Sequence, residues 1–198
     1  MTSFTRTGLL RRSVAGGAVL ASASLLTPLV EAASAAPPDG DLAYLRLLIA
    51  TELLEVDFAS RALAAGKLGS ESTATFKELL ADDQAHSTGL ASLLTGAGQT
   101  PATADDITFI YPRGSFDSEA AILKLADTLE DLSLGAYLGA VQNVQTPRFR
   151  LPIGQIGANE AQHVSALAQL SGRPLIGPAF APSLQMDSVS AALDTYES

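Results

Sequence analysis

The sequence contains no cysteine, which removes several kinds of site at once. Without a thiol, the chain has no disulfide framework, no thiolate nucleophile and no zinc-thiolate site, and cysteine usage cannot assign a redox compartment. Basic residues are also few, since 12 Lys and Arg stand against 21 Asp and Glu, and the formal net charge is −9. A charge of this sign argues against nucleic acid and anionic membrane surfaces as partners. Metal cations and neutral molecules remain.

The first 35 residues have the pattern of an export signal. Arg6, Arg11 and Arg12 precede an apolar stretch over residues 13–30, and the small residues Ala33, Ser34 and Ala35 follow it. Cleavage is expected after Ala35, and the paired arginines are similar to a twin-arginine signal. An ordinary secretory signal and an uncleaved anchor are the alternatives. The mature protein is therefore predicted to be exported and free of the membrane.

The rest of the chain shows no strand signal and is predicted to be all-α. At 198 residues with 47% hydrophobic content, it is long enough for one domain with a sizeable core. Apolar residues recur at three- and four-residue steps, which is typical of helices with one buried face. Asp39 or Asp41 is expected to cap the first helix, with Val56 on its buried stripe and Val141 on that of the third. The expected helices cover residues 41–66, 72–94, 118–144 and 152–170.

The connections between these segments predict how the helices are joined. Loops of roughly five residues link the first helix to the second and the third to the fourth, as in helical hairpins. The segment over residues 96–116 is long for a turn, so it is predicted to cross the bundle from end to end. The bundle is expected over residues 36–171, and residues 172–198 form a tail that packs on it as an extended strap with a short helix near 189–193.

Histidine is also scarce, and the position of both histidines is the most informative feature of the chain. His86 follows Asp83 by three residues, and His163 follows Glu160 by the same spacing. On a helix, residues three apart lie on one face, so each pair can direct both donors at one cation. A single core histidine would be the simpler interpretation of one such pair, but the chain has two.

Each pair also has a glutamate on the preceding predicted helix. From Glu52 to His86 the separation is 34 residues, and from Glu130 to His163 it is 33 residues. Four carboxylates and two imidazoles would then converge inside a four-helix bundle. Such donors suit two iron or manganese ions, with Glu52 and Glu130 as terminal ligands and Asp83 and Glu160 as candidates to bridge. Two redox metals can react with dioxygen or peroxide, so oxidation is the leading reaction class.

The chain resembles the ferritin-like superfamily, in particular exported bacterial ferritin-like proteins grouped with desiccation-related proteins. The resemblance covers about residues 41–171 and includes Tyr137 after Glu130; the tail sequence Pro178-Ala-Phe-Ala-Pro182 is also similar to that group. It implies a four-helix bundle with a non-haem diiron or dimanganese centre and a repertoire of ferroxidase, peroxidase, catalase and oxygenase activities. Asp83 departs from the usual glutamate and is one methylene shorter, which leaves open whether it reaches both metals.

Two further residues lie on or near the same faces. Glu55, one turn after Glu52, is either an additional ligand, an acceptor for a histidine proton, or a half-exposed glutamate. Tyr137 is expected to be a core tyrosine or a donor to a ligand carboxylate. Asp82, beside Asp83, is expected to point to solvent.

Whether the chain is an enzyme is left open. The alternative to an oxidoreductase is a non-catalytic binding or stress-protective protein of the envelope with a degenerate or structural metal site. Iron storage is a third alternative, which would require a closed multi-subunit shell. A homo-oligomer is compatible with the sequence but is not indicated by any feature of it.

Overall fold

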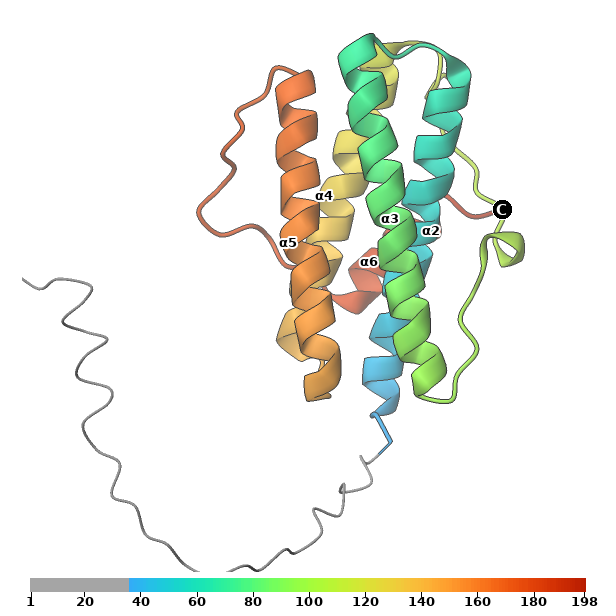
Figure 1. Ribbon diagram of the computed structural model, residues 1–198, viewed down its shortest axis with the longest axis vertical. Helices are drawn as coiled ribbons and strands as arrows, with labels where there is room; N and C mark the ends of the chain where they lie inside the picture. The colour runs from blue at the N-terminus through green and yellow to red at the C-terminus, as the bar shows by residue number, and fades with distance from the viewer. Residues whose placement is uncertain (1–35) are drawn as a thin grey trace, which may run out of the picture. The chain divides into compact units, whose positions relative to one another are not determined.

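The computed structural model describes residues 36–198, and these residues form an all-helical bundle (Figure 1). The predicted export signal over residues 1–35 lies outside the described residues. The described part contains no β-strand beyond an isolated bridge between Phe109 and Glu197. The all-α prediction is confirmed. The helices are α2 (Asp39–Ala65), α3 (Ser70–Gly96), the 3₁₀ turn η1 (Ala104–Asp106), α4 (Glu119–Asn143), α5 (Pro147–Leu170) and α6 (Met186–Leu193).

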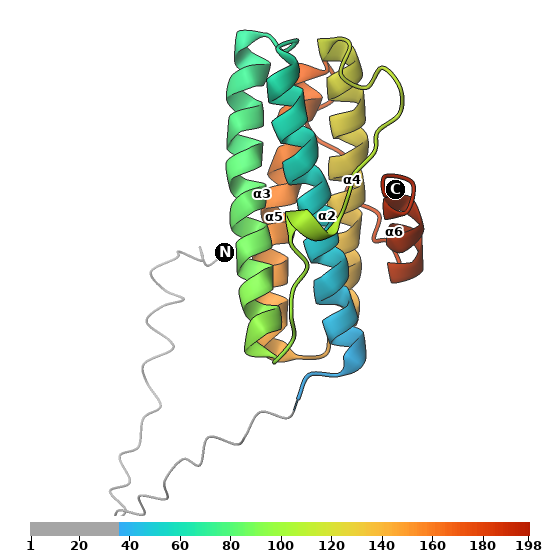
Figure 2. The ribbon, with the colours of Figure 1, turned by 90° about the vertical axis from the view of Figure 1, so that its right-hand side faces the viewer.

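The four long helices are arranged as two hairpins. Helix α2 pairs with α3, and α4 pairs with α5, each through a short connection. The segment between α3 and α4 runs along the length of the bundle, so that α3 and α4 point in the same direction (Figure 2). This is the predicted crossover topology of a ferritin-like four-helix bundle. Within the described residues, no helix is both long and apolar enough to cross a membrane.

The buried stripes agree with the predicted ones around the ligand-type residues and differ from them in the C-terminal halves of α2 and α4. On α2, Glu55, Ala59 and Ala62 are buried, whereas the expected Val56 is only half-buried. On α4, Val141 is 39% exposed, and Ala140 faces the core in its place. A repeat of 3.6 residues per turn alternates steps of three and four, so one misplaced step moves the rest of the stripe by one residue.

The helix ends differ from the expected ones for local reasons. Pro38 precedes α2, and Asp39 and Asp41 lie in its first turn, so the expectation that either caps this helix was wrong. Asp41 instead accepts hydrogen bonds from the backbone N–H groups of Gln145 and Thr146, just before α5. Helix α5 begins at Pro147, five residues before the predicted start, because proline at the first helical position loses no helical hydrogen bond. Pro152 lies inside it.

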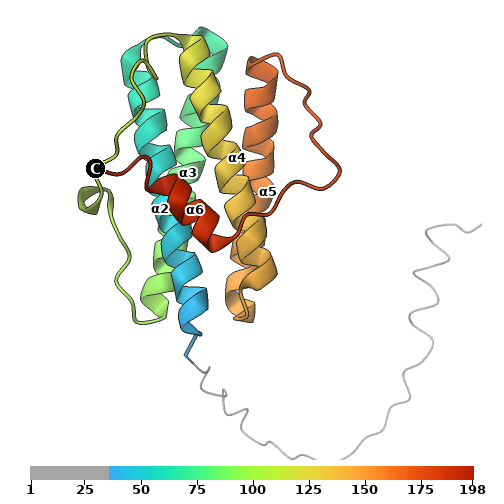
Figure 3. The same cartoon turned by 180° about the vertical axis from the view of Figure 1, so that it is seen from behind.

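The C-terminal tail packs on the bundle only in part. The first residues of the tail contact the bundle, because Arg173 pairs with Asp127 on α4 and Ser165 on α5 donates a hydrogen bond to the carbonyl of Leu175. Residues 176–182 stand away from it, and Ile176 and Phe180 are about nine-tenths exposed, so the expected packed strap was wrong for residues 176–182 (Figure 1). From Leu184 onward the tail does pack. Helix α6, which begins three residues before the predicted start, lies across α2 and α4 and buries Val189 and Leu193 (Figure 3). Beyond it, Tyr196 accepts a backbone hydrogen bond from Ile110 and so ties the C-terminus to the crossover.

Candidate metal centre

Each long helix delivers a ligand-type side chain to the middle of the bundle. These side chains lie on the buried stripes because their spacing of three, four or seven residues from apolar core positions keeps them on the inward face. None is more than 9% exposed. All six residues predicted from the sequence are brought together: Glu52 on α2, Asp83 and His86 on α3, Glu130 on α4, and Glu160 and His163 on α5.

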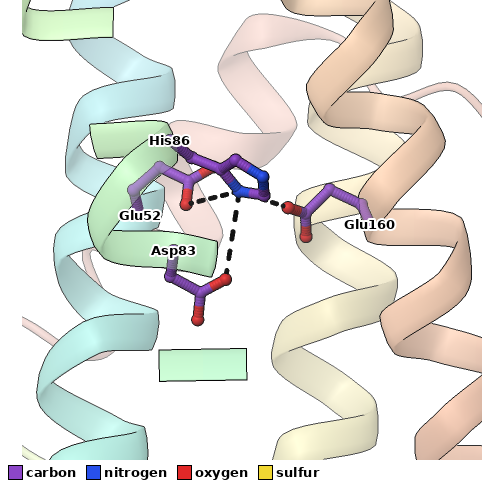
Figure 4. A group of neighbouring side chains, drawn as sticks. All are labelled: Glu52, Asp83, His86 and Glu160. Atoms are coloured by element: carbon purple, nitrogen blue, oxygen red, sulfur yellow. Dashed lines mark ion pairs between the residues drawn. The ribbon is translucent and has the colours of Figure 1, made fainter. Parts of the chain in front are cut away.

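The first group of donors surrounds Nδ1 of His86 (Figure 4). This nitrogen lies 3.0 Å from Oε1 of Glu160 and 3.4 Å from Oε2 of Glu52. Oδ1 of Asp83 is 4.0 Å away. The donors come from three helices, so the tertiary fold, and not one helix alone, assembles this group.

The second group surrounds Nδ1 of His163. Oε2 of Glu130 lies 3.3 Å from this nitrogen, Oδ1 of Asp83 lies 3.6 Å from it, and Oε2 of Glu160 lies 3.8 Å from it. Asp83 and Glu160 therefore approach both histidines, whereas Glu52 and Glu130 each approach one. Although aspartate is shorter than the usual glutamate, a single oxygen of Asp83 lies between the two imidazoles.

The inward-facing atoms fit a pair of bound cations better than they fit each other. They are buried and close together, yet the geometry between them is not that of donor and acceptor in a hydrogen bond. A buried polar atom without a partner is costly, and metal ions satisfy such atoms. The unpartnered atoms of the six residues are Glu52 Oε2, Asp83 Oδ1, His86 Nδ1, Glu130 Oε2, Glu160 Oε1 and Oε2, and His163 Nδ1.

Without a metal, the site retains protons. Burial raises the pKa of Asp83 to about 10, and the nearby Glu130 acts in the same direction. Burial also raises the pKa of Glu52 to about 7, although His86 partly opposes this. For His86, burial would lower the pKa, but the interactions with Glu160 and Glu52 outweigh it and raise the pKa to about 10. Metal binding at these donors must therefore release protons.

The outward nitrogen of each histidine contacts a residue that precedes a ligand-type carboxylate on the facing helix. Nε2 of His86 lies 2.9 Å from Oδ1 of Asn159, and Nε2 of His163 lies 3.3 Å from Oδ2 of Asp82. When Nε2–H donates to these oxygens, the lone pair of Nδ1 is directed inward, which is the tautomer that a metal ligand requires. Sequence reasoning missed Asn159 and expected Asp82 to be solvated. Asp82 is half-exposed, yet it reaches His163.

Tyr137 and Glu55 complete the polar interior. The hydroxyl of Tyr137, which is fully buried, donates a hydrogen bond to Oε1 of Glu52 and so fixes that carboxylate. Gly157 makes room for this ring, because a Cβ there would lie 3.1 Å from Cβ of Tyr137. Glu55 is 3% exposed, so the half-exposed alternative for this residue is excluded. Burial, together with the charges of Glu130 and Glu160, raises its pKa well above the ordinary value.

Comparison with known proteins assigns the family. The family model of the ferritin-like domain matches residues 40–173, which is more than half of the chain and includes the crossover and all six ligand-type residues. The chain belongs to the ferritin-like family. No match was found among the curated proteins, so the family assignment rests on the domain. The ferritin-like match supports metal binding by the carboxylate and histidine groups of this bundle.

Proposed function

We propose that this ferritin-like protein binds two iron or manganese ions and reacts with dioxygen or peroxide, in oxidant defence or iron oxidation. The observation that carries the proposal is the sharing of Asp83 and Glu160 by two inward-facing imidazole nitrogens, with none of these atoms hydrogen-bonded. The ligands would be Glu52, Asp83 and His86 on one side and Glu130, Glu160 and His163 on the other.

The donor set favours iron or manganese over other metals. Four carboxylates can neutralise two divalent cations, and two imidazoles add one nitrogen donor for each. Zinc sites usually have fewer ligands, and copper favours softer or planar sets. When bound, two such metals supply redox chemistry toward dioxygen or peroxide. The chain's own contribution is to hold the donors in place through Tyr137, Asn159 and Asp82 and to exclude bulk water with apolar walls.

Export is a second part of the proposal. The arginine pair at positions 11 and 12 and the apolar stretch after it support a twin-arginine signal, which carries folded proteins and would let the metal be inserted before export. Replacing Arg11 and Arg12 by lysine should abolish export of the full-length chain. Unchanged export of that variant would contradict this route.

Metal analysis of purified protein tests the main proposal. Protein expressed with added iron and manganese should contain about two metal ions per chain, and the double variant Glu130→Ala, His163→Ala should lose at least one. The exposed Glu78→Gln on α3 serves as the control and should keep both. Peroxide and dioxygen consumption by the loaded protein then tests the reaction.

Other outcomes would favour the alternatives. Folded protein that stays metal-free would contradict the proposal and favour a non-catalytic binding or stress-protective protein. A metal-loaded protein without peroxide or dioxygen consumption would limit the site to a structural role. A large closed assembly by size-exclusion chromatography would favour iron storage, because a monomer or dimer has no cavity in which to hold mineral.

A further inference from the structure

The tail over residues 176–183 forms an arch that is held at both ends and stands off the bundle in between (Figure 3). Before the arch, Arg173 pairs with Asp127 on α4. After it, the backbone N–H of Leu184 donates a hydrogen bond to the carbonyl of Gly135, also on α4. Every residue of the arch is exposed, and its prolines restrict the backbone. The arch is therefore a tethered and stiffened segment whose side chains are not buried by the described chain.

A cavity of about 900 Å³ lies between this arch and the outward face of α4 and α5. Pockets for small molecules commonly have volumes of about 300–1,000 Å³. The floor of the cavity includes the half-buried side chains of Leu132, Leu134 and Val164, and Ile176 and Pro178 line it from the arch side. Apolar walls around a water-filled space cost free energy, because these side chains are more stable away from water. A bound apolar molecule removes this cost.

The polar groups of the cavity restrict the polar end of such a molecule. The hydroxyls of Ser165 and Thr128 already donate to backbone carbonyls, and the guanidinium of Arg173 is paired with Asp127. Asp131 also lines the cavity, and no hydrogen bond or ion pair joins its side chain to another residue of the described chain. An ionised carboxylate only accepts hydrogen bonds, and it repels a second carboxylate. A matching ligand therefore donates a hydrogen bond at its polar end and carries no negative charge.

This cavity is separate from the candidate metal centre, although it lies at the same level of the bundle. Ala161 and Val164, which line the cavity, each follow a ligand-type residue of α5, namely Glu160 and His163. Consecutive residues on a helix point about 100° apart, so the inward donors and the cavity lie on different faces of the same helix turns. None of the six ligand-type residues lines the cavity. A molecule bound there is thus held by residues that the metal centre does not use.

We propose that the cavity under the arch binds an apolar molecule whose polar end is a hydroxyl or an amino group that donates a hydrogen bond to Asp131. The helices form the floor of the site and the arch forms its roof. Because the arch is tied to α4 at both ends, the space beneath it suits a slender molecule such as a long-chain alcohol or amine better than a folded protein surface. The proposal is independent of metal binding.

Binding of the uncharged apolar dye Nile red to the purified protein tests the site. The wild-type protein should bind about one dye molecule per chain, with an increase in fluorescence. Decanol and decylamine should displace the dye, and the two arms distinguish a hydroxyl from an amino end. Decanoate, which has a carboxylate on a chain of the same length, should displace it poorly. Asp131→Asn should improve displacement by decanoate, and the exposed Asp105→Asn should not.

Two variants fill the cavity from opposite walls. Ala161→Phe on α5 and Ala179→Phe on the arch should each weaken dye binding at least about tenfold, because the added rings occupy the space of the ligand. The exposed Ala158→Phe on α5 adds the same ring away from the cavity and should bind like the wild-type protein. Circular dichroism establishes that each variant is folded.

Three results would overturn the proposal. The first is no dye binding by the wild-type protein, or equal binding by Ala161→Phe and Ala158→Phe. The second is displacement by decanoate as strong as that by decanol, which would remove the role of Asp131. The third is a wild-type dimer by size-exclusion chromatography that becomes a monomer in Ala179→Phe, since the arch would then contact a second copy of the chain instead of a small molecule.

Discussion

Nε2 of His86 lies 2.9 Å from the side-chain oxygen of Asn159, on the helix that faces it across the bundle. The same relationship joins His163 to Asp82, so each imidazole is held by the residue that precedes the carboxylate of the other pair. The two halves of the centre are therefore related in pattern but unequal in charge, because one imidazole faces a neutral amide and the other a carboxylate.

Removing the amide should weaken metal binding at His86. In Asn159→Ala, Nε2 of His86 loses its acceptor, so neither the orientation nor the tautomer of the ring is fixed. We expect a loss of about 10- to 100-fold in the affinity for Mn(II), measured by calorimetry. Gln162→Ala, an exposed change on the same helix, is the control and should bind like the wild-type protein. Equal affinities for the two variants would contradict a role for Asn159 in orienting His86.

Without metal, the protein should lose stability as the pH rises. The pKa of Glu52 is raised to about 7 and that of Asp83 to about 10, so the folded state binds more protons than the unfolded state. The stabilisation that these bound protons give the folded state is complete below the ordinary carboxyl pKa. It is lost as the pH rises through the raised pKa values of Glu52 and Asp83. His86, with its pKa raised to about 10, acts in the same direction. The thermal midpoint in EDTA should therefore fall between about pH 5 and about pH 8.

Bound metal should reverse this trend, because protons compete with cations for the same donors. The midpoint of the Mn(II)-loaded protein should rise over the same pH interval. Glu52→Gln should reduce the fall seen in EDTA, since an amide does not titrate there. A midpoint in EDTA that rises with pH would show that the buried carboxylates are not protonated in the folded state.

Asp41 links the start of α2 to the start of α5, and its loss should destabilise the fold. Its carboxylate accepts hydrogen bonds from the backbone N–H groups of Gln145 and Thr146, at 3.0 Å and 2.6 Å. Burial acts to raise the pKa of Asp41, but the hydrogen bonds with Thr146 and Gln145 outweigh it and lower the pKa. Asp41→Ala should cost about 1.5–3 kcal/mol in the free energy of unfolding, measured with urea at neutral pH.

Asp39→Ala is the matched control for this change. Asp39 lies in the same first turn but is exposed, so its removal should cost no more than about 1 kcal/mol through the helix dipole. The pKa of Asp41 is lower in the folded state than in the unfolded state, so its ionised carboxylate stabilises the fold at neutral pH and this stabilisation is lost in acid. The difference between the two variants in the free energy of unfolding should therefore shrink as the pH falls below about 4. Equal costs at neutral pH would mean that the hydrogen bonds to α5 contribute nothing.

The sequence predicted the six ligand-type residues because their arrangement depends mainly on helical periodicity. Spacings of three residues place Asp83 beside His86 and Glu160 beside His163 on any regular helix, and these four residues lie mid-helix. Glu55 was harder to place, because the choice between it and Val56 depends on whether the stripe of α2 advances by three or four residues at that turn. The structure shows that it advances by three.

The partners of the outward nitrogens could not be predicted in the same way. Asn159 and Asp82 reach His86 and His163 only because α3 and α5 lie side by side at one particular offset, which periodicity within a single helix does not specify. The exposed stretch of the tail was missed for a related reason. Its prolines predict extended backbone but not what that backbone packs against.

The docking of the tail on α4 depends on glycine at position 139. A Cβ there would lie 2.0 Å from the carbonyl oxygen of Leu184, and the N–H of Leu184 donates a hydrogen bond to the carbonyl of Gly135 one turn earlier. Gly139→Ala must therefore displace the backbone of the tail. We expect a loss of about 1–3 kcal/mol in the free energy of unfolding and faster amide hydrogen exchange in α6.

Gly89→Ala separates this steric effect from the general effect of alanine on a helix. Gly89 is exposed on α3, and a Cβ there would meet no heavy atom within 4 Å. This change should stabilise the protein by up to about 1 kcal/mol, because alanine favours the helix over glycine. The two substitutions should thus change the free energy of unfolding in opposite directions. If Gly139→Ala stabilised the protein as Gly89→Ala does, with unchanged exchange in α6, then Leu184 would not be docked against α4 in solution.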